Sequence, residues 1–357
     1  MAQIVGDYPD IERVETGLWS LDRALSGNSG LGIPMTFMEI FGFQGVGKTT
    51  LATSLMSFIA KQYGQKVAYA PFEHIDTKLM GMILDAHECE QEVTLLSGWD
   101  TIKKFFPSYK RNAKENITDE LILDCFLEAV RSPEYCVGVV DSLSSLVTIA
   151  EAGSSVAERN MGKARVVSNF SRAVVQAFRV REEKPFCAIV LTHKTVPMGG
   201  GMPTSTGAVT TGGEVKKNVS KVRIGVRRLN EPAFEMNSKK ELYDEPAYIL
   251  EGKVEKNNFG RDDRKFFVAM LGGKGAHIGL TAMYECKRLG ICSFGKSINL
   301  GGQRFGSVAT MLDLAHQGKN EEFQPFIDAL KNPSKIAKVE MEEADDAFET
   351  YDGEAAE

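Results

Sequence analysis

The sequence contains Gly42-Phe43-Gln44-Gly45-Val46-Gly47-Lys48-Thr49, which matches the P-loop pattern Gly-x-x-x-x-Gly-Lys-Ser/Thr. An apolar, β-prone run over residues 36–41 precedes this motif, and residues 50–61 follow it with apolar side chains at helical spacing. The glycine loop therefore lies between a predicted strand and a predicted helix, which is the context that a P-loop requires. A chance glycine-rich turn would lack this order of elements.

This order of elements predicts a nucleotide site. Glycines let successive backbone N–H groups turn toward a phosphate, and the helix N-terminus adds partial positive charge. The lysine of such a loop reaches the β- and γ-phosphates, and the hydroxyl that follows it ligates Mg²⁺. We therefore expect ATP and Mg²⁺ as cofactors, held by Gly42, Phe43, Gln44, Gly45, Val46, Gly47, Lys48, Thr49 and Thr50.

The composition is that of a soluble globular protein. The chain has 357 residues, of which 43% are hydrophobic and 25% charged. No apolar run approaches the ~20 residues of a membrane helix, and residues 1–10 lack the basic and apolar regions of a secretion signal. The six cysteines form no C-x-x-C pair, so we expect buried free thiols and no zinc site. We therefore expect a cytoplasmic location and no membrane partner.

The charge is distributed unevenly along the chain. Residues 340–357 contain nine acidic residues and no Lys or Arg, so the net charge of −6 leaves +3 for residues 1–339. Such a tail is predicted to be disordered. Two roles remain open for it, namely solubility and electrostatic mimicry of a nucleic acid that competes for a basic groove.

Alternating strand-like and helix-like segments predict an α/β fold with a mostly parallel central sheet. After the P-loop unit, strands are expected at 67–71, 92–96, 136–141 and 186–192, and helices at 77–87, 117–132 and 163–181. Beyond a long loop at 194–213, the segments 219–228, 246–256 and 265–271 are strand-like with little helix between them. We expect these three to extend the sheet as antiparallel strands.

The expected division of the chain has four parts. They are a short N-terminal arm (1–15), a core that contains the P-loop and the long loop (16–275), a small C-terminal helical unit (276–335) and the acidic tail (336–357).

Three strand ends carry candidate catalytic residues. Asp141 ends an apolar strand. In P-loop proteins a carboxylate at such a strand end holds Mg²⁺ together with the P-loop hydroxyl, which is that of Thr49 here. Glu73 follows the strand at 67–71 and can polarise an attacking water. His193 follows the strand at 186–192 and can contact the γ-phosphate. The sequence pattern alone also fits an exposed loop residue at Glu73, and it also fits a structural histidine at His193.

A long polar loop and a basic helix face indicate a nucleic-acid surface. Residues 194–213 are rich in Gly, Thr, Ser and Pro, and connections of this length are usually functional. Arg165, Arg172 and Arg179 recur every seven residues and share one face of the predicted helix. This pattern favours binding to a phosphate backbone without sequence readout, although a solvated basic face gives the same spacing.

Together these motifs resemble the RecA-type strand-exchange recombinases, and most closely their phage UvsX-like branch, over residues 16–330. The resemblance rests on residues 16–25, 42–49, 72–74, 140–142, 160–165, 191–193, 210–213 and 254–258. It implies a RecA-like P-loop ATPase core with Glu73, Lys48 and His193 as catalytic residues. It also implies that Asp141 binds the nucleotide's metal and that Lys256 reaches the ATP of a neighbouring subunit. Histidine as the γ-phosphate sensor is similar to the phage branch, and a phage-encoded protein would act in the cytoplasm of the bacterial host.

The same resemblance assigns two DNA-binding loops. The first comprises Met161, Gly162, Lys163, Arg165 and Arg172. The second comprises Gly199, Gly200, Gly201, Thr210, Thr211, Gly212 and Gly213.

Two departures from the family pattern stand out. About fifteen residues precede the first motif, too few for the family's N-terminal helix, so residues 4–11 are expected to make the polymerisation contact as an added strand. Asn258 stands where a second cation is expected beside Lys256, and Arg261 or Arg264 is expected to replace it.

The resemblance implies an ATP-dependent recombinase that forms a helical homo-oligomer on single-stranded DNA and exchanges strands with a homologous duplex. Its partners would be single- and double-stranded DNA, its own copies, and single-strand-binding or mediator proteins. Two alternatives remain: a hexameric DNA helicase or translocase on the same core, and an ATP-binding recombination mediator with little turnover.

Overall fold

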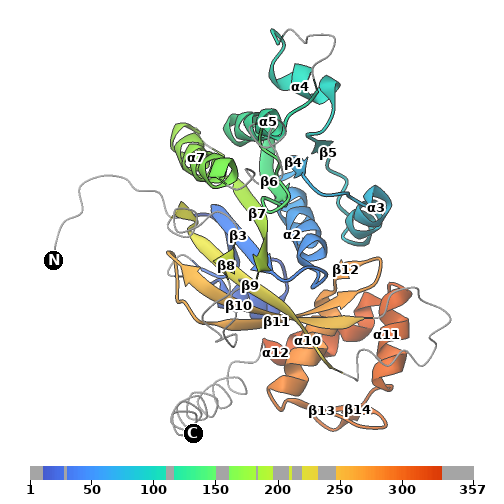
Figure 1. The fold of residues 1–357 in the computed structure, drawn as a ribbon. Coiled ribbons are helices and arrows are strands. Elements are labelled where there is room, and N and C mark those ends of the chain that lie inside the picture. The colour runs from blue at the N-terminus through green and yellow to red at the C-terminus, as the bar shows by residue number, and fades with distance from the viewer. Residues whose placement is uncertain are drawn as a thin grey trace, which may run out of the picture.

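The computed structural model describes residues 11–27, 30–109, 116–149, 161–181, 184–195, 209–210, 219–231 and 247–331. Its centre is a ten-stranded sheet in the order β12-β11-β10-β9-β3-β7-β6-β4-β5, with β8 beside β7 (Figure 1). The strands are β3 (Phe37–Gly42), β4 (Lys66–Pro71), β5 (Val93–Leu95), β6 (Tyr135–Asp141), β7 (Cys187–Thr195), β8 (Val209–Thr210), β9 (Val222–Leu229), β10 (Tyr248–Asn257), β11 (Lys265–Leu271) and β12 (Gly275–Ala276).

Helices flank this sheet, and two small sheets lie outside it. The helices are α1 (Trp19–Ala24), α2 (Lys48–Tyr63), α3 (Thr77–Ala86), α4 (Trp99–Phe105), α5 (Asp119–Arg131), α7 (Met161–Val180), α10 (Ile278–Arg288), α11 (Val308–His316), the 3₁₀ turn η1 (Asn320–Phe323) and α12 (Gln324–Leu330). The small sheets are the pair β1 (Arg13–Val14) and β2 (Ile33–Pro34), and the group β13 (Cys292–Phe294), β14 (Ile298–Leu300) and β15 (Gln303–Arg304). The predicted α/β fold is confirmed.

The direction of one strand differs from the prediction. Strands β3 to β7 pair in parallel, and β9 also pairs in parallel with β3, with Met38 opposite Val222. In the described part of this sheet, β10, β11 and β12 are antiparallel to their neighbours, and so is the short β8 to β7. The expectation that all strands after residue 213 are antiparallel is therefore wrong for β9. The direction of a strand depends on the end of the sheet at which the chain enters it. The pattern of apolar residues is the same for both directions and does not reveal which one occurs.

The two faces of the sheet are covered by different helices. Alternate residues of β3 point to opposite faces, so that Phe37 packs with α5 and α7 while Met38 and Ile40 pack with α1 and α2. Figure 1 shows α2 and α3 on one side of the parallel strands and α5 and α7 on the other. All seven residues of β6 are buried, as expected for a strand covered on both faces.

The long segment at 194–213 is structured at both ends. Strand β7 continues past His193 to Thr195, and β8 returns antiparallel beside it, with Lys194 opposite Thr210. A plain loop was expected throughout, and these paired ends correct that expectation. Residues 196–208 and 211–213 lie outside the described part of the chain.

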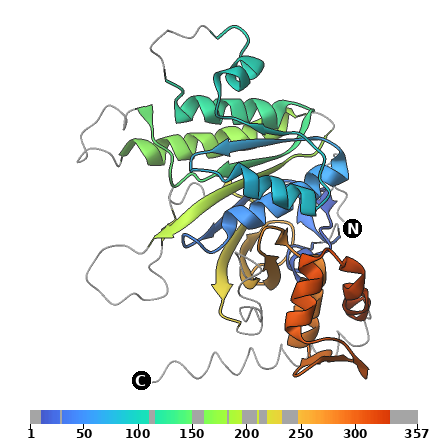
Figure 2. The ribbon, with the colours of Figure 1, turned by 90° about the vertical axis from the view of Figure 1, so that its right-hand side faces the viewer.

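The C-terminal unit shares its core with the antiparallel strands. Ile249 of β10 and Leu271 of β11 pack in one cluster with Leu280, Met283 and Phe326 of the C-terminal helices. Figure 2 shows this unit, drawn in orange and red, gathered at one end of the molecule. The small sheet β13–β15 and helix α4 were not predicted, because strands of two or three residues and a helix of seven carry little periodicity.

A buried polar group ties three strands together. The side chain of Glu39 on β3 accepts hydrogen bonds from Thr192 Oγ1 on β7 (2.6 Å) and from Arg223 Nε on β9 (2.8 Å). Glu39 is fully buried and stands opposite Arg223 in the parallel register. A one-residue slip of β9 would leave this carboxylate without its cation, so the pair fixes the register.

All six cysteines are buried and free, as expected from the sequence. Thr118 caps α5 by accepting a hydrogen bond from the Leu121 N–H. None of the helices in the described residues is long and apolar enough to span a membrane.

A buried histidine caps helix α10. The Nδ1 atom of His277 accepts a hydrogen bond from the Leu280 N–H at 3.1 Å, so the neutral ring carries its proton on Nε2. Burial, with smaller contributions from Lys274 and His87, lowers the pKa of His277 from 6.5 to about 4. Protonation would place a hydrogen on Nδ1 and remove the cap.

The free energy of unfolding should therefore fall as the pH drops from 6.5 to about 4, because the unfolded chain takes up a proton that the folded chain excludes. The His277 contribution is about 3 kcal/mol. The variant His277→Asn keeps a capping acceptor that does not titrate, so urea unfolding across this pH range should show a shallower loss. His74→Gln, at an exposed position, serves as the control. Parallel pH curves for His277→Asn and wild type would contradict this account.

Candidate nucleotide-binding site

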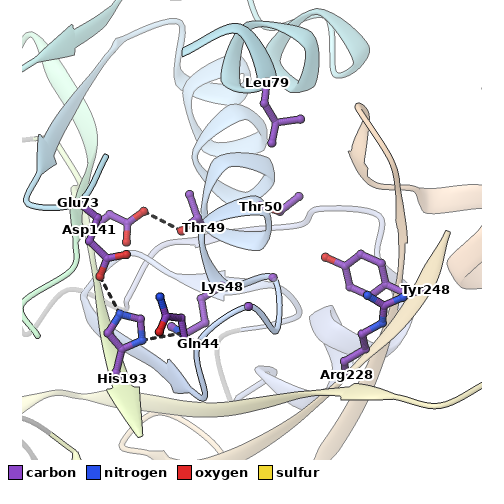
Figure 3. Close-up of a pocket in the computed structure, with 12 residues that line it drawn as sticks. Gln44, Lys48, Thr49, Thr50, Glu73, Leu79, Asp141, His193, Arg228 and Tyr248 are labelled. Atoms are coloured by element: carbon purple, nitrogen blue, oxygen red, sulfur yellow. Dashed lines mark hydrogen bonds and ion pairs between the residues drawn. The ribbon is translucent and has the colours of Figure 1, made fainter. Parts of the chain in front are cut away.

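Parallel pairing brings the candidate catalytic residues to one edge of the sheet. The loop after β3, the Glu73 segment after β4, Asp141 of β6 and His193 of β7 all lie at the carboxyl ends of parallel strands. They line a cleft of about 420 Å³ (Figure 3). The residues lining this cleft are Gln44, Gly45, Gly47, Lys48, Thr49, Thr50, Glu73, Leu79, Asp141, His193, Arg228 and Tyr248.

The glycine loop turns directly into helix α2. Gly45 and Gly47 adopt φ values of +76° and +99°, a left-handed conformation that side chains disfavour. Gly47 is the N-cap of α2, so the first N–H groups of the helix and its partial positive charge face the cleft. This geometry suits a bound phosphate group.

Lys48 lies in the first turn of α2 and is almost fully buried. Its ammonium donates a hydrogen bond to the Phe43 carbonyl (2.8 Å) and lies 3.2 Å from Nδ1 of His193. Burial lowers the pKa of Lys48, while the negative charges of Glu73 and Asp141 act in the opposite direction. The sequence motif thus places a cation at the base of the cleft.

Asp141 and Thr49 offer two oxygen ligands side by side. Asp141 Oδ2 accepts hydrogen bonds from Thr49 Oγ1 at 2.7 Å and from the Tyr69 hydroxyl at 2.8 Å. Burial raises the pKa of Asp141, and the two hydroxyl groups partly oppose that effect. A carboxylate beside a hydroxyl fits Mg²⁺, which prefers oxygen ligands and keeps several waters. Tyr69 was not predicted, because it lies inside β4 and reads as a core residue.

Glu73 and His193 are in direct contact. Nε2 of His193 lies 2.6 Å from Glu73 Oε1. An ammonium only donates hydrogen bonds, so Nδ1 of His193 accepts from Lys48 and the proton of the neutral ring lies on Nε2. The resulting chain of hydrogen bonds runs from Lys48 through His193 to Glu73. The structure thus brings together all three residues predicted as catalytic.

Two serine hydroxyls also donate to the same oxygen of Glu73. Ser142 Oγ lies at 2.5 Å and Ser145 Oγ at 2.7 Å from Oε1. Burial acts to raise the pKa of Glu73, but the hydrogen bonds from Ser142, Ser145 and His193 outweigh it and hold the pKa below its ordinary value. Glu73 is therefore a carboxylate at neutral pH and can orient a water molecule.

Lys256 does not reach this cleft. Strand β10 begins at Tyr248, beside the glycine loop, and runs antiparallel to β9, so Lys256 near its end lies at the opposite edge of the sheet. Burial, together with Lys221 and Arg223, lowers the pKa of Lys256. Arg264, predicted as a substitute cation, instead donates hydrogen bonds to the Arg23 carbonyl and the Ser26 hydroxyl.

The residues assigned to DNA contacts are only partly described. Arg165 and Arg172, with Arg179, are exposed on α7, which agrees with the predicted basic face. The Lys163 ammonium donates to the Ser144 carbonyl. Met161 begins α7, and Gly162 follows it. Thr210 is described only as part of strand β8, and Gly199, Gly200, Gly201, Thr211, Gly212 and Gly213 lie outside the described residues.

One wall of the cleft was not predicted. In Figure 3, Arg228 and Tyr248 lie across the glycine loop from Glu73, Asp141 and His193. The guanidinium of Arg228 stacks 4.5 Å from the centre of the Tyr248 ring. Both residues reach the cleft because β9 is parallel to β3, a direction that no sequence pattern indicated.

No family model matches the sequence. A crystal structure of the RadB recombinase is similar over 74% of this chain and 98% of that chain, with 16% sequence identity and a TM-score of 0.48. We therefore base the functional inference on the cleft and the sequence motifs.

The close approach of Tyr248 to Gly47 gives a test of this geometry. A Cβ atom at Gly47 would lie 2.3 Å from the Tyr248 hydroxyl, whereas a Cβ atom at Gly45 would meet no atom within 4 Å. Both glycines have positive φ, so Gly45→Ala should cost about 1–2 kcal/mol of unfolding free energy, and Gly47→Ala more. Tyr248→Phe should recover part of the difference in urea unfolding. Equal losses with and without that hydroxyl would refute the contact.

Proposed function

We propose that this protein is a DNA-dependent ATPase that assembles as a helical filament on single-stranded DNA and catalyses pairing and strand exchange with a homologous duplex. The support comes from the RecA-type motifs in the sequence and from the arrangement of Lys48, His193 and Glu73 in one cleft. A small-molecule kinase would leave the basic face of α7 and the long segment after β7 without a role.

The observation that carries this proposal is the position of His193 on β7. Its ring contacts both Lys48 and Glu73, and the next two residues of the same strand begin the segment assigned to DNA binding. A γ-phosphate would attract the Lys48 ammonium and weaken its bond to His193 Nδ1. The resulting movement of His193 would be passed through the backbone to Lys194, the next residue. It could thereby order or disorder the segment assigned to DNA binding.

In the proposed reaction each residue has one role. Lys48 and the backbone N–H groups of the glycine loop hold the phosphates, and Thr49 with Asp141 holds the hydrated metal ion. Bound Mg²⁺ would neutralise charge on the phosphate oxygens. Glu73 orients and polarises the attacking water.

A head-to-tail assembly would complete the site. Lys256 lies at the sheet edge opposite the cleft of its own chain, so it can reach a nucleotide only in a neighbouring subunit. Repeated contacts between two unlike surfaces generate a helix when the rotation between successive subunits does not close them into a ring. The position of Lys256 therefore favours a polymer, and a closed ring remains the alternative.

Glu73→Gln tests the catalytic assignment. The amide cannot accept a proton from water, so ATP turnover should fall at least about a hundredfold while nucleotide affinity changes little. Lys48→Ala should instead abolish nucleotide binding, measured with a fluorescent ATP analogue. Unchanged turnover in Glu73→Gln would remove Glu73 from the mechanism.

Arg165→Ala tests the DNA-binding face. Loss of one phosphate contact should weaken single-stranded DNA binding and reduce the slope of log K against log salt by about 0.7. Arg304→Ala, an exposed arginine on β15 of the C-terminal unit, is the matched control and should leave both quantities unchanged. Equal effects of the two substitutions would show that α7 has no special role.

The function itself is tested by ATP hydrolysis with and without single-stranded DNA at two salt concentrations. Stimulation that fades with salt supports the proposal, and electron microscopy then separates helical filaments from the closed rings of a helicase. Hydrolysis indifferent to DNA would contradict the proposal and favour a recombination mediator.

A further inference from the structure

The turn that follows β6 contacts Glu73, His193 and Lys163, and no sequence motif predicts these contacts. It spans residues 142–146 and closes with a hydrogen bond from the Ser145 N–H to the Ser142 carbonyl (3.0 Å). The Leu143 N–H donates to the Leu191 carbonyl of β7 (3.0 Å), and the side chains of Leu143 and Leu146 are buried. The turn is therefore packed against the core through its two leucines; Ser142 is buried, whereas Ser144 and Ser145 are partly exposed.

On one side, this turn holds the catalytic carboxylate. Ser142 and Ser145 both donate to Oε1 of Glu73, at 2.5 and 2.7 Å. Together with His193 they place three donors around one oxygen. The other carboxylate oxygen then has a defined direction, which is what a group that orients water needs.

On its other side, the turn reaches His193 and helix α7. Ser144 Oγ accepts the backbone N–H of His193 at 2.7 Å. The carbonyl of the same residue accepts a hydrogen bond from the Lys163 ammonium, in the first turn of α7. One residue thus joins the proposed phosphate sensor to the helix that carries the proposed DNA contacts.

The chain after the turn is anchored to a third helix. The Val147 N–H donates to Asp119 Oδ2 (2.6 Å) and the Ile149 N–H donates to Glu120 Oε1 (2.7 Å), both at the start of α5. The turn is therefore fixed to β7 and α5 by backbone groups, while a long and flexible side chain joins it to α7. Of these links, the hydrogen bond from the Lys163 ammonium is the one that a polyanion can break, because its phosphates compete for that ammonium.

We infer that the 142–146 turn couples DNA binding to catalysis. In the absence of DNA, Lys163 is bonded to the Ser144 carbonyl; a DNA phosphate takes this ammonium and releases the turn, so that Ser144 and Ser145 reposition His193 and Glu73. Ser144 and Ser145 are positioning residues, because they act on the reaction only through those two side chains. The inference rests on the proposed function and adds a route from DNA to the active site.

The decisive variant is Lys163→Met, which removes the ammonium and keeps the length of the side chain. This variant mimics the released turn, so its DNA-free ATP hydrolysis should rise about tenfold and saturating single-stranded DNA should add little. Arg165→Met, two residues along α7, is the matched control. It should bind DNA more weakly but keep full stimulation once DNA is saturating.

Ser145→Ala tests the link between the turn and Glu73. Loss of one donor leaves Oε1 of Glu73 less firmly held, so kcat should fall about tenfold while the KM for ATP changes little. Ser145→Thr restores a hydroxyl and should restore kcat, which a merely structural defect would not allow.

The outcomes separate this inference from the proposed function. A wild-type protein whose hydrolysis ignores DNA would overturn both. A stimulated wild type together with a Lys163→Met variant that has the same low DNA-free rate and the same stimulation would overturn the coupling alone. A kcat that stays at the wild-type value in Ser145→Ala would remove that serine from the route.

Discussion

Parallel pairing of β3, β4, β6 and β7 is the constraint on which the cleft depends. Each of these strands ends at the same edge of the sheet, so residues separated by more than a hundred positions in sequence meet without any special loop. His193 stands opposite Gly42 in register, and Asp141 opposite Pro71. The contacts of Lys48 with His193 and of Thr49 with Asp141 follow from these two registers.

The buried pair of Glu39 and Arg223 protects this arrangement. A carboxylate inside a sheet is costly to bury, and it is tolerated here because its oxygens accept bonds from Thr192 and Arg223. Buried ion pairs contribute little net stability but penalise wrong registers. Their role in this protein is to hold β9 parallel to β3 and in step with it, which in turn brings Arg228 to the cleft.

Much of the cleft could be predicted from sequence, because a P-loop and apolar strands that end in Asp141 and His193 are local patterns. The residues that escaped prediction depend on non-local geometry. Tyr69 reads as a core residue of β4 until Asp141 is placed beside its hydroxyl. Arg228 and Tyr248 belong to the site only because of the direction of β9. Ser144 and Ser145 carry no pattern at all, since their partners come from other strands and another helix.

Strand β10 links two surfaces that lie at opposite edges of the sheet. Its first residue, Tyr248, packs over Gly47 in the chain's own cleft, and Lys256 lies near its far end, at the opposite edge. Ten residues of extended chain span roughly 30 Å and form a rod held between β9 and β11, with a register shift between Val254 and Lys256. In the proposed head-to-tail assembly, a displacement of Tyr248 by nucleotide would therefore move the cation offered to the next subunit. Such a rod would let the occupancy of successive sites influence one another along the polymer without any hinge between domains.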